Sequence, residues 1–307
     1  MDELLTLLVC PFEYAELLSD GDALRCVQCQ RRYPIDEDGI VSFLGDVEEG
    51  AAGWDTESER YADGFSRYTD DVEIPATVGR LPSLPVPTVL DHGCGTGRMT
   101  AALHRHTGHR VLALDYSREN LRRLLRDVEK GSVLALHADA RRLPIRSGCL
   151  GGVCSAGVYP LLRADERRVL IDELHRVLHP RGSLVLSTLN YSWVFRLWRL
   201  RGNRGAREGD HLYGQDIYYR RQSGRELRRE LNERFEVDTL CGIRNIPVRT
   251  LVGGCQRVLG ERRSAPLIRL INRIGPGLDR AVERVMVSRL TGFMLLARAR
   301  PRADRER

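Results

Sequence analysis

The stretch "VLDHGCGTGRMT", residues 89–100, carries the strongest structural signal in the chain. A short apolar run ends in Asp91 and is followed by glycines at alternate positions, Gly93, Gly95 and Gly97. Glycine adopts backbone angles that other residues avoid and lets a ligand approach the backbone closely. A strand that enters such a turn before a helix is typical of the ligand-binding crevice of an open parallel sheet. We therefore expect a ligand to lie against this turn.

The spacing of the glycines argues against a dinucleotide. The dinucleotide fingerprint Gly-x-Gly-x-x-Gly, counted from Gly93, requires a glycine at the position where the chain has Arg98. The chain also lacks the Gly-Lys-Thr/Ser sequence of a phosphate-binding loop. The predicted ligand therefore needs no phosphate group.

Two further acids stand at the ends of the next predicted strands. Asp115 closes "VLALD" and Asp139 follows "LALHA", each 24 residues after the preceding acid, which is the length of one strand-helix repeat. Asp115 could accept hydrogen bonds from both hydroxyls of a ribose, and Asp139 from an adenine amine. Asp91 would then oppose an ammonium group beside the turn. A ligand with an adenine, a ribose and a cationic amino-acid end is S-adenosylmethionine.

Strands and helices alternate along the chain from residue 85 onward. Helical stretches separate the strands, for example "SRENLRRLLRDVEK" with Ser117 at the N-cap position. This order predicts an α/β fold with a mostly parallel sheet and helices on both faces. The apolar runs that predict strands lie at 87–91, 110–115, 133–138, 150–155, 183–189, 235–241 and 291–299.

The motifs of residues 85–190 resemble those of class I S-adenosylmethionine-dependent methyltransferases. "VLDHGCGTG" is similar to the first motif of the family, "LDYS" to its ribose motif, "DARRLP" to its adenine motif and "ELHRVLHPRGSLVLST" to its fifth strand. The resemblance implies a Rossmann-like seven-stranded sheet with an antiparallel last strand, and S-adenosyl-L-methionine as cofactor. The cofactor-binding residues that it implies are Asp91, Gly93, Cys94, Gly95, Gly97, Asp115, Tyr116, Asp139, Ala140 and Ser155.

The chain departs from the family pattern before the fourth strand. Relatives usually have Phe-Asp there, whereas this chain has Leu150-Gly151. The acid is mainly structural in the family. We therefore expect a change in local strand geometry rather than a loss of activity.

Residues 1–45 are predicted to form a small β module that resembles a zinc ribbon. Cys10, Cys26 and Cys29 have the spacing C-x15-C-x2-C, and the fourth ligand position of such a site falls on Glu13. The segment resembles small zinc-binding proteins that activate tRNA and protein methyltransferases, and the zinc module of bacterial large-subunit rRNA guanine-N1 methyltransferases. Because a carboxylate can bind zinc at about 2 Å, these four residues are the candidate ligands. A metal-free module of the same fold is the alternative.

The remaining domain boundaries follow from composition. A linker and a helical lead-in at 46–84 join the module to a methyltransferase domain at 85–300, and the Arg-rich tail 301–307 is expected to be disordered. Insertions at about 192–222 and 243–290 lie where this fold forms a cap over its substrate.

The C-terminal part of the chain is strongly basic. Residues 190–307 contain 26 Arg against 13 Asp and Glu. Such a surface is typical of anionic partners such as nucleic acid or phospholipid. The helices expected in 243–290 are amphipathic as well as basic, so they could contact a membrane surface. We expect their apolar faces to pack in the core instead.

No motif identifies the methyl acceptor. The chain lacks the Asn/Asp-Pro-Pro-Tyr/Phe motif used on exocyclic base amines, and Cys154 belongs to a predicted strand rather than to a Pro-Cys nucleophile. Candidates on the acceptor side are Tyr159, Asn190, Tyr191 and His211, of which His211 could act as a base near neutral pH. A small-molecule acceptor, lipid-like or a secondary metabolite, is favoured. The alternatives are an RNA methyltransferase and a non-catalytic partner that binds the cofactor.

The sequence also gives an expectation about location. No apolar run reaches the roughly 18 residues of a membrane span, and the start "MDELLTLLVCP" carries acids where a secretory signal is basic. The cysteines are too scattered for a disulfide framework. We therefore expect a cytoplasmic protein, and the oligomeric state stays open.

Overall fold

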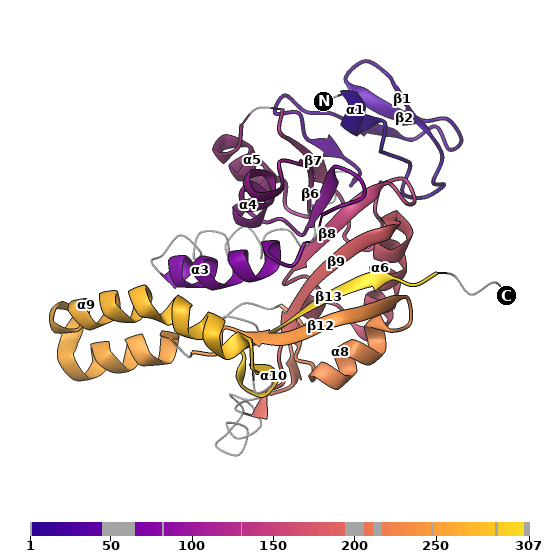
Figure 1. Ribbon diagram of the computed structural model, residues 1–307. Helices are drawn as coiled ribbons and strands as arrows, with labels where there is room; N and C mark the ends of the chain where they lie inside the picture. Colours follow the sequence, from indigo (N-terminus) through magenta and orange to yellow (C-terminus); the bar gives the residue numbers. More distant parts are fainter. Residues whose placement is uncertain are drawn as a thin grey trace.

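An eight-stranded sheet organises the computed structural model, which describes residues 2–44, 65–81, 83–129, 131–193, 206–210, 217–246, 248–285 and 288–303. The strand order is β12-β13-β9-β8-β5-β6-β7-β4 (Figure 1). Strands β9, β8, β5, β6, β7 and β4 run parallel, and β13 runs antiparallel between β9 and β12. Seven of the strands are those predicted from residue 85 onward: β5 (Thr88–His92), β6 (Arg110–Asp115), β7 (Val133–His137), β8 (Leu150–Ala156), β9 (Leu178–Leu189), β12 (Phe235–Ile243) and β13 (Met294–Pro301).

The sheet is buried on both faces because its central strands are apolar at nearly every position. Leu90 and Leu112 face one half of the core, whereas their neighbours Val89 and Val111 face the other half. The alternation is that of a pleated strand, in which successive side chains point to opposite faces. The fold is therefore the predicted α/β sandwich with a largely parallel central sheet.

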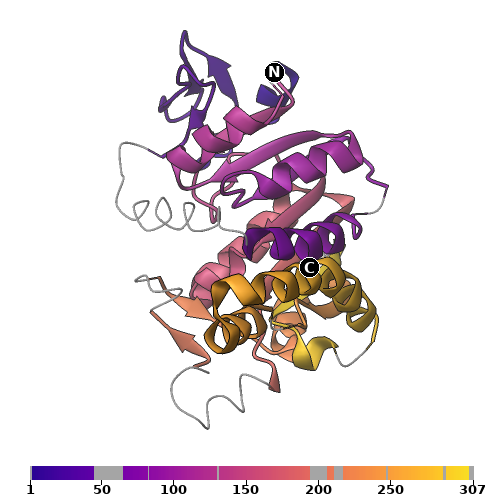
Figure 2. The same cartoon turned by 90° about the vertical axis from the view of Figure 1, so that its left-hand side faces the viewer.

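Helices cover both faces of the sheet (Figures 1 and 2). One face packs against α3 (Phe65–Val78), α4 (Arg98–Thr107) and α5 (Arg118–Asp127), and the other against α6 (Ala164–Val177) and α8 (Gly224–Leu231). Ser117 caps α5 as predicted, because its hydroxyl accepts a hydrogen bond from the amide of Asn120 at 3.1 Å. Short elements complete this part: η1 (Tyr159–Leu161), α10 (Ser288–Thr291), β10 (Glu208–Gly209) and β11 (Tyr219–Arg220).

The strand β8 is irregular near Leu150-Gly151, where the sequence departs from the family pattern. The register between β8 and β9 shifts between Leu150 and Gly152. A Cβ atom on Gly151 would lie 2.1 Å from the carbonyl oxygen of Val86, so no side chain fits at this position. Two backbone segments therefore approach each other closely at Gly151.

The N-terminal module supplies the eighth strand of the sheet. It contains a three-stranded antiparallel sheet, and its last strand β4 pairs in parallel with β7. Leu8 of the module also forms a β-bridge with Ile145, and both side chains are fully buried. The module therefore shares a core with the larger domain. Its elements are α1 (Asp2–Leu5), β1 (Leu17–Ser19), β2 (Ala23–Cys26), β3 (Arg32–Pro34) and β4 (Val41–Ser42).

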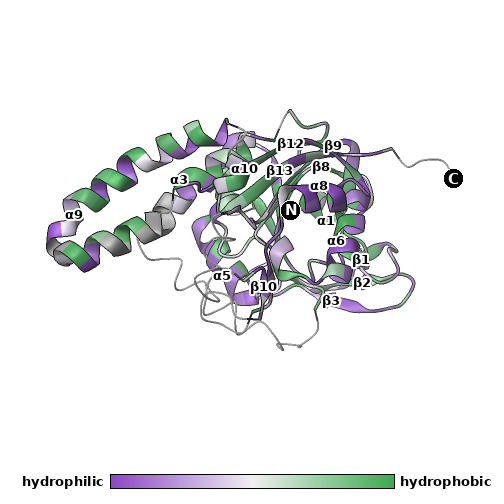
Figure 3. Ribbon diagram, turned by 90° about the horizontal axis from the view of Figure 1, so that it is seen from below, coloured by the Kyte–Doolittle hydropathy of each residue, from purple (hydrophilic) through white to green (hydrophobic). Residues whose placement is uncertain are grey.

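Helix α9 (Val248–Glu283) extends away from the sheet as a helical hairpin. The backbone is non-helical at Gly260, which separates two arms that lie side by side (Figures 1 and 3). None of the helices in the described residues is both long and apolar enough to cross a membrane.

Candidate cofactor and metal sites

The turn after β5 exposes its backbone at the carboxyl ends of the parallel strands. Gly93, Gly95 and Gly97 have φ angles of 71°, 53° and 88°, in the region that side chains avoid. The amides of Gly93 and Cys94 both donate to the carbonyl oxygen of Leu114, at 2.8 and 2.9 Å, and fix the turn to β6. A Cβ atom on Gly97 would lie 2.5 Å from Leu124, whereas one on Gly95 would meet nothing within 4 Å. Gly95 is therefore open and Gly97 is packed.

A cavity of about 500 Å³ lies against this turn. It brings together seven of the ten predicted cofactor residues, which are Gly93, Cys94, Gly95, Asp115, Tyr116, Asp139 and Ala140. Burial holds the pKa of the Cys94 thiol well above its ordinary value, so this residue borders the cavity as a neutral thiol. The predicted crevice therefore exists at the predicted place.

Asp115 presents a fixed carboxylate to the cavity. One oxygen accepts from the amide of Gly95 at 2.8 Å and the other from the amide of Ser117 at 2.9 Å. Burial raises the pKa of this carboxyl, and the amide hydrogen bonds act against that shift. Each oxygen keeps further acceptor capacity. The arrangement suits a ligand with two neighbouring hydroxyls.

Asp139 is held by an arginine that the sequence did not single out. The guanidinium of Arg141 donates to both oxygens of Asp139, with a shortest distance of 2.7 Å, and also pairs with Glu166. Burial would raise the pKa of Asp139, but Arg141 lowers it below its ordinary value. Arg141 and Glu166 line the cavity together with Asp139. This end of the cavity therefore carries a charged network rather than a lone acid.

Three of the predicted cofactor residues do not line the cavity. Asp91 is 1% exposed and accepts a hydrogen bond from the hydroxyl of Thr100 in α4 at 2.6 Å. Burial raises the pKa of Asp91 to about 6. Ser155 is also buried, with its hydroxyl 3.0 Å from Nδ1 of His92. Gly97, as described above, packs against α5. Asp91 therefore does not line the cavity, because its side chain points toward α4, and its role beside an ammonium group stays a prediction.

A glutamate from α3 lines the cavity, whereas Asp91 does not. One carboxylate oxygen of Glu73 lies 2.7 Å from Arg98, and the other lies 3.1 Å from Arg244. Burial would raise the pKa of Glu73, but the two guanidinium groups lower it, so the carboxylate stays ionised. All three side chains line the cavity. No local sequence pattern predicts Glu73 at this site, because α3 approaches the turn only in the folded chain.

The residues proposed for the acceptor side have structural contacts instead. Tyr159 is fully buried and its hydroxyl donates to Glu230 at 2.7 Å. The side-chain amide of Asn190 donates to the carbonyl oxygen of Gly292 at 2.8 Å. The ring of Tyr191 lies beneath the guanidinium of Arg207, whose carbon is 5.5 Å from the ring centre. His211 lies outside the described residues.

The cavity has an apolar wall, of which Ile217 alone lies in a segment that the sequence assigned to the substrate cap. It is formed by Leu161, Leu189, Ile217 and Met294, which come from η1, the end of β9, the segment before β11 and the start of β13. The charged residues Glu73, Arg98 and Arg244 border the same cavity. A single cavity therefore offers both polar and apolar surfaces to what it binds.

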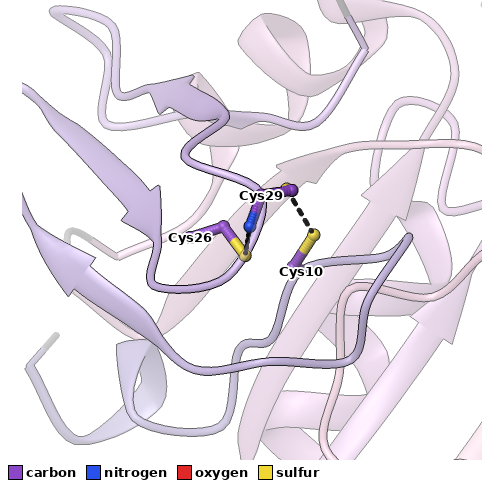
Figure 4. Close-up of side chains that lie close together, drawn as sticks. All are labelled: Cys10, Cys26 and Cys29. Atoms are coloured by element: carbon purple, nitrogen blue, oxygen red, sulfur yellow. Dashed lines mark hydrogen bonds between the residues drawn. The ribbon is translucent and has the colours of Figure 1, made fainter.

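The three predicted cysteines of the N-terminal module converge on one point (Figure 4). The sulfur atoms of Cys10, Cys26 and Cys29 all lie within 4.8 Å of one another. The sulfur of Cys10 is 3.1 Å from the hydroxyl of Tyr33. Burial raises the pKa of Cys10, but hydrogen bonds from Tyr33 and from backbone amides outweigh it and lower the pKa. Among the described residues, the cluster consists of the three cysteines without Glu13, whose carboxylate accepts from Gln28 at 3.3 Å.

Comparisons with known protein families and sequences identify the central part of the chain. Residues 89–182 match the family model described as a methyltransferase domain. The malonyl-[acyl-carrier protein] O-methyltransferase of Herminiimonas arsenicoxydans is 36% identical over 110 residues, which are 36% of this chain and 40% of that protein. The carboxy-S-adenosyl-L-methionine synthase of Erwinia tasmaniensis is 33% identical over 106 residues, 32% of this chain and 42% of that protein. The chain thus spans about two fifths of these relatives.

Solved structures share the fold over most of the chain. A chain of the complex between the Haloferax volcanii Trm112 methyltransferase activator and a methyltransferase has a TM-score of 0.58 at 19% identity, covering 84% of this chain and 99% of that chain. The 1,6-didemethyltoxoflavin-N1-methyltransferase of Burkholderia thailandensis has a TM-score of 0.51 at 18% identity, covering 94% and 100%. At these identities the likeness concerns the fold.

Proposed function

We propose that this chain, whose residues 89–182 match a methyltransferase domain, transfers the methyl group of S-adenosylmethionine to a small acceptor with an apolar body. The observation that carries the proposal is the cavity. Its glycine turn and carboxylates suit the cofactor, and the apolar wall beside them suits the apolar body of a second molecule.

The residues of the cavity fit the predicted cofactor. The two hydroxyls of its ribose would donate hydrogen bonds to the carboxylate of Asp115, which the Gly95 amide already orients. The adenine would lie toward Asp139 and Ala140. The amino-acid end would lie at the turn, where Glu73 offers a negative charge to the ammonium and Arg98 a positive charge to the carboxylate. In this arrangement Glu73 has the role that the sequence assigned to Asp91.

Methyl transfer places simple demands on the protein. S-adenosylmethionine, when bound, supplies a methyl group on a cationic sulfur. The chain must align the acceptor with that group and exclude water. Leu161, Leu189 and Ile217 serve this purpose, because they present only hydrocarbon to the cavity. The carboxylates of the cavity already bind arginines or backbone amides, so we assign none of them as a general base.

A small acceptor is favoured over RNA for a geometric reason. A cavity of about 500 Å³ lies in the size range of small-molecule sites, and its apolar wall suits an acceptor with a hydrocarbon surface. The matched relatives are named for malonyl-[acyl-carrier protein] and for carboxy-S-adenosyl-L-methionine, and neither name refers to a nucleic acid. A lipid-like or metabolite acceptor agrees with both observations.

The test is a transfer assay with methyl-labelled cofactor. Purified protein is incubated with cell extract, and label is counted in RNA, in protein and in small molecules that extract into organic solvent. We expect label in the last fraction. Ile217→Trp, which reduces the space beside the apolar wall of the cavity, should reduce methyl transfer without weakening cofactor binding. Label in RNA would overturn the proposed acceptor class, and tight cofactor binding without transfer to any fraction would indicate a non-catalytic partner.

We also propose that Cys10, Cys26 and Cys29 bind zinc. Three thiolates at mutual distances below 4.8 Å suit a tetrahedral zinc ion. The structure places the Tyr33 hydroxyl, rather than Glu13, next to the cluster. The fourth position would therefore fall to a water molecule, because burial raises the pKa of Tyr33 and its hydroxyl stays a hydrogen-bond donor to Cys10. Elemental analysis of the purified protein tests the proposal, and Glu13→Gln should retain the metal.

A further inference from the structure

The second arm of α9 exposes apolar side chains in a regular row. Leu267, Leu270, Ile274 and Leu278 are 38%, 50%, 48% and 53% exposed. Their spacings of three, four and four residues place them on one side of the helix. We call these four residues the apolar stripe. Figure 3 shows apolar positions recurring along both arms of α9, which extends beyond the sheet.

The opposite side of this arm is already packed. Asp279 is buried and accepts hydrogen bonds from the backbone and the side-chain amide of Asn245 at 2.9 and 3.1 Å. Glu283 pairs with Arg80, which follows α3. These contacts hold the arm against the body of the protein and turn the stripe outward. The expectation that the apolar face of this segment packs in the core is therefore wrong for the stripe.

Arginines lie beside the stripe. Arg269, Arg273, Arg280 and Arg284 are exposed, and among the described residues none of them forms an ion pair with an acid. At about 100° per residue, Arg273, Arg280 and Arg284 lie about a quarter to a third of a turn from the centre of the stripe. The acids of the same segment, Asp279 and Glu283, are bound to the body of the protein. The exposed side of the arm is therefore apolar in the middle and positive along one edge.

We propose that the apolar stripe docks onto an anionic membrane surface. A helix in this position places apolar side chains among the lipid acyl chains near the headgroups, while the arginines reach the phosphates. Charge complementarity selects this occupant. The matching stripe and arginines of a second copy of the chain would offer these arginines no anionic group, and a nucleic acid would leave the apolar side chains without a partner. The proposal does not depend on methyl transfer.

The direct test is sedimentation of the full chain with lipid vesicles. We expect binding to vesicles that contain phosphatidylglycerol, weaker binding to pure phosphatidylcholine, and a decrease with added salt. The triple variant Leu270→Ser, Ile274→Ser, Leu278→Ser should bind at least about tenfold more weakly. The matched control is Val169→Ser, which changes a side chain that is 47% exposed on α6 and should bind like the wild type.

A second variant set separates charge from apolar contact. A triple variant should lose the preference for phosphatidylglycerol; its substitutions are Arg273→Gln, Arg280→Gln and Arg284→Gln. The control variant Arg168→Gln, on α6, should keep this preference. All variants should bind S-adenosylmethionine like the wild type, because the cavity is not changed. Equal binding of wild type and stripe variant to anionic vesicles would overturn the proposal. The proposal would also be overturned if the wild type were a dimer and the stripe variant a monomer, because the stripe would then be an interface between two copies of the chain.

Discussion

Alanine at Gly95 should separate ligand binding from folding. Gly95 has a φ of 53° and faces the cavity, and a Cβ atom there would meet no protein atom within 4 Å. Gly108, which ends α4, is a matched control, because its φ is 64° and its Cβ position is equally open. A left-handed alanine costs about 1 kcal/mol relative to glycine. Both variants should therefore unfold about 2 °C below the wild type.

Only Gly95→Ala should lose cofactor affinity. The added methyl group would occupy space next to the Gly95 amide, which donates to Asp115 at 2.8 Å. A ligand pushed away from the turn would lose at least one hydrogen bond to this carboxylate, worth about 1.5 to 3 kcal/mol. We expect an increase in Kd of about tenfold to a hundredfold for Gly95→Ala, and no change for Gly108→Ala.

Isothermal titration of S-adenosylmethionine into both folded variants measures the difference. Thermal unfolding of the same samples checks that their stabilities match. Equal affinities for the two variants would show that the ligand does not lie against the turn, and the proposed cofactor position would have to be abandoned.

Three further predictions concern single side chains. Asp115→Ala removes the carboxylate that accepts from the turn and would accept from the ribose, so calorimetry should show at least about a hundredfold weaker cofactor binding. Asp91→Asn should stabilise the fold at pH 8 but not at pH 4, because the wild-type carboxyl has a pKa of about 6 when folded. Above that pH it must ionise while buried, at a cost of about 3 kcal/mol relative to an ordinary carboxyl, and chemical denaturation at both pH values measures this difference. Cys26→Ser should lower the zinc content found by elemental analysis, and unchanged metal would exclude the cysteine cluster.

The sequence predicted the sheet and most of the crevice because both depend on local patterns. Strand residues such as Val111 and Leu112 are apolar in an uninterrupted run, and Asp115 follows them at the strand end. The direction of a strand-end side chain is a different matter. Asp91 and Asp115 have the same place in the pattern, yet Asp91 turns to Thr100 of α4. The direction of such a side chain depends on which face of the sheet the neighbouring helix covers. The spacing of residues along the chain does not predict that face.

Residues that reach the cavity from distant segments were also missed. Glu73 belongs to α3, before the sheet, and Arg244 follows β12 near the other end of the chain. They meet at 3.1 Å only because α3 packs against the sheet and α9. A single sequence has no local signal for such a contact. The apolar stripe of α9 was misplaced for a related reason, since helical periodicity predicts an apolar face but not what covers it.

The boundary at residue 45 divides the sequence but not the core. Strand β4 pairs with β7, and the hydroxyl of Ser42 lies 2.9 Å from Nδ1 of His137. Nε2 of the same ring is 3.1 Å from the carbonyl oxygen of Tyr116, which lines the cavity next to Asp115. Contacts therefore run from the module to the wall that would hold the ribose. Because buried contacts of this kind form and break together, the N-terminal module and the cofactor cavity should behave as one cooperative unit.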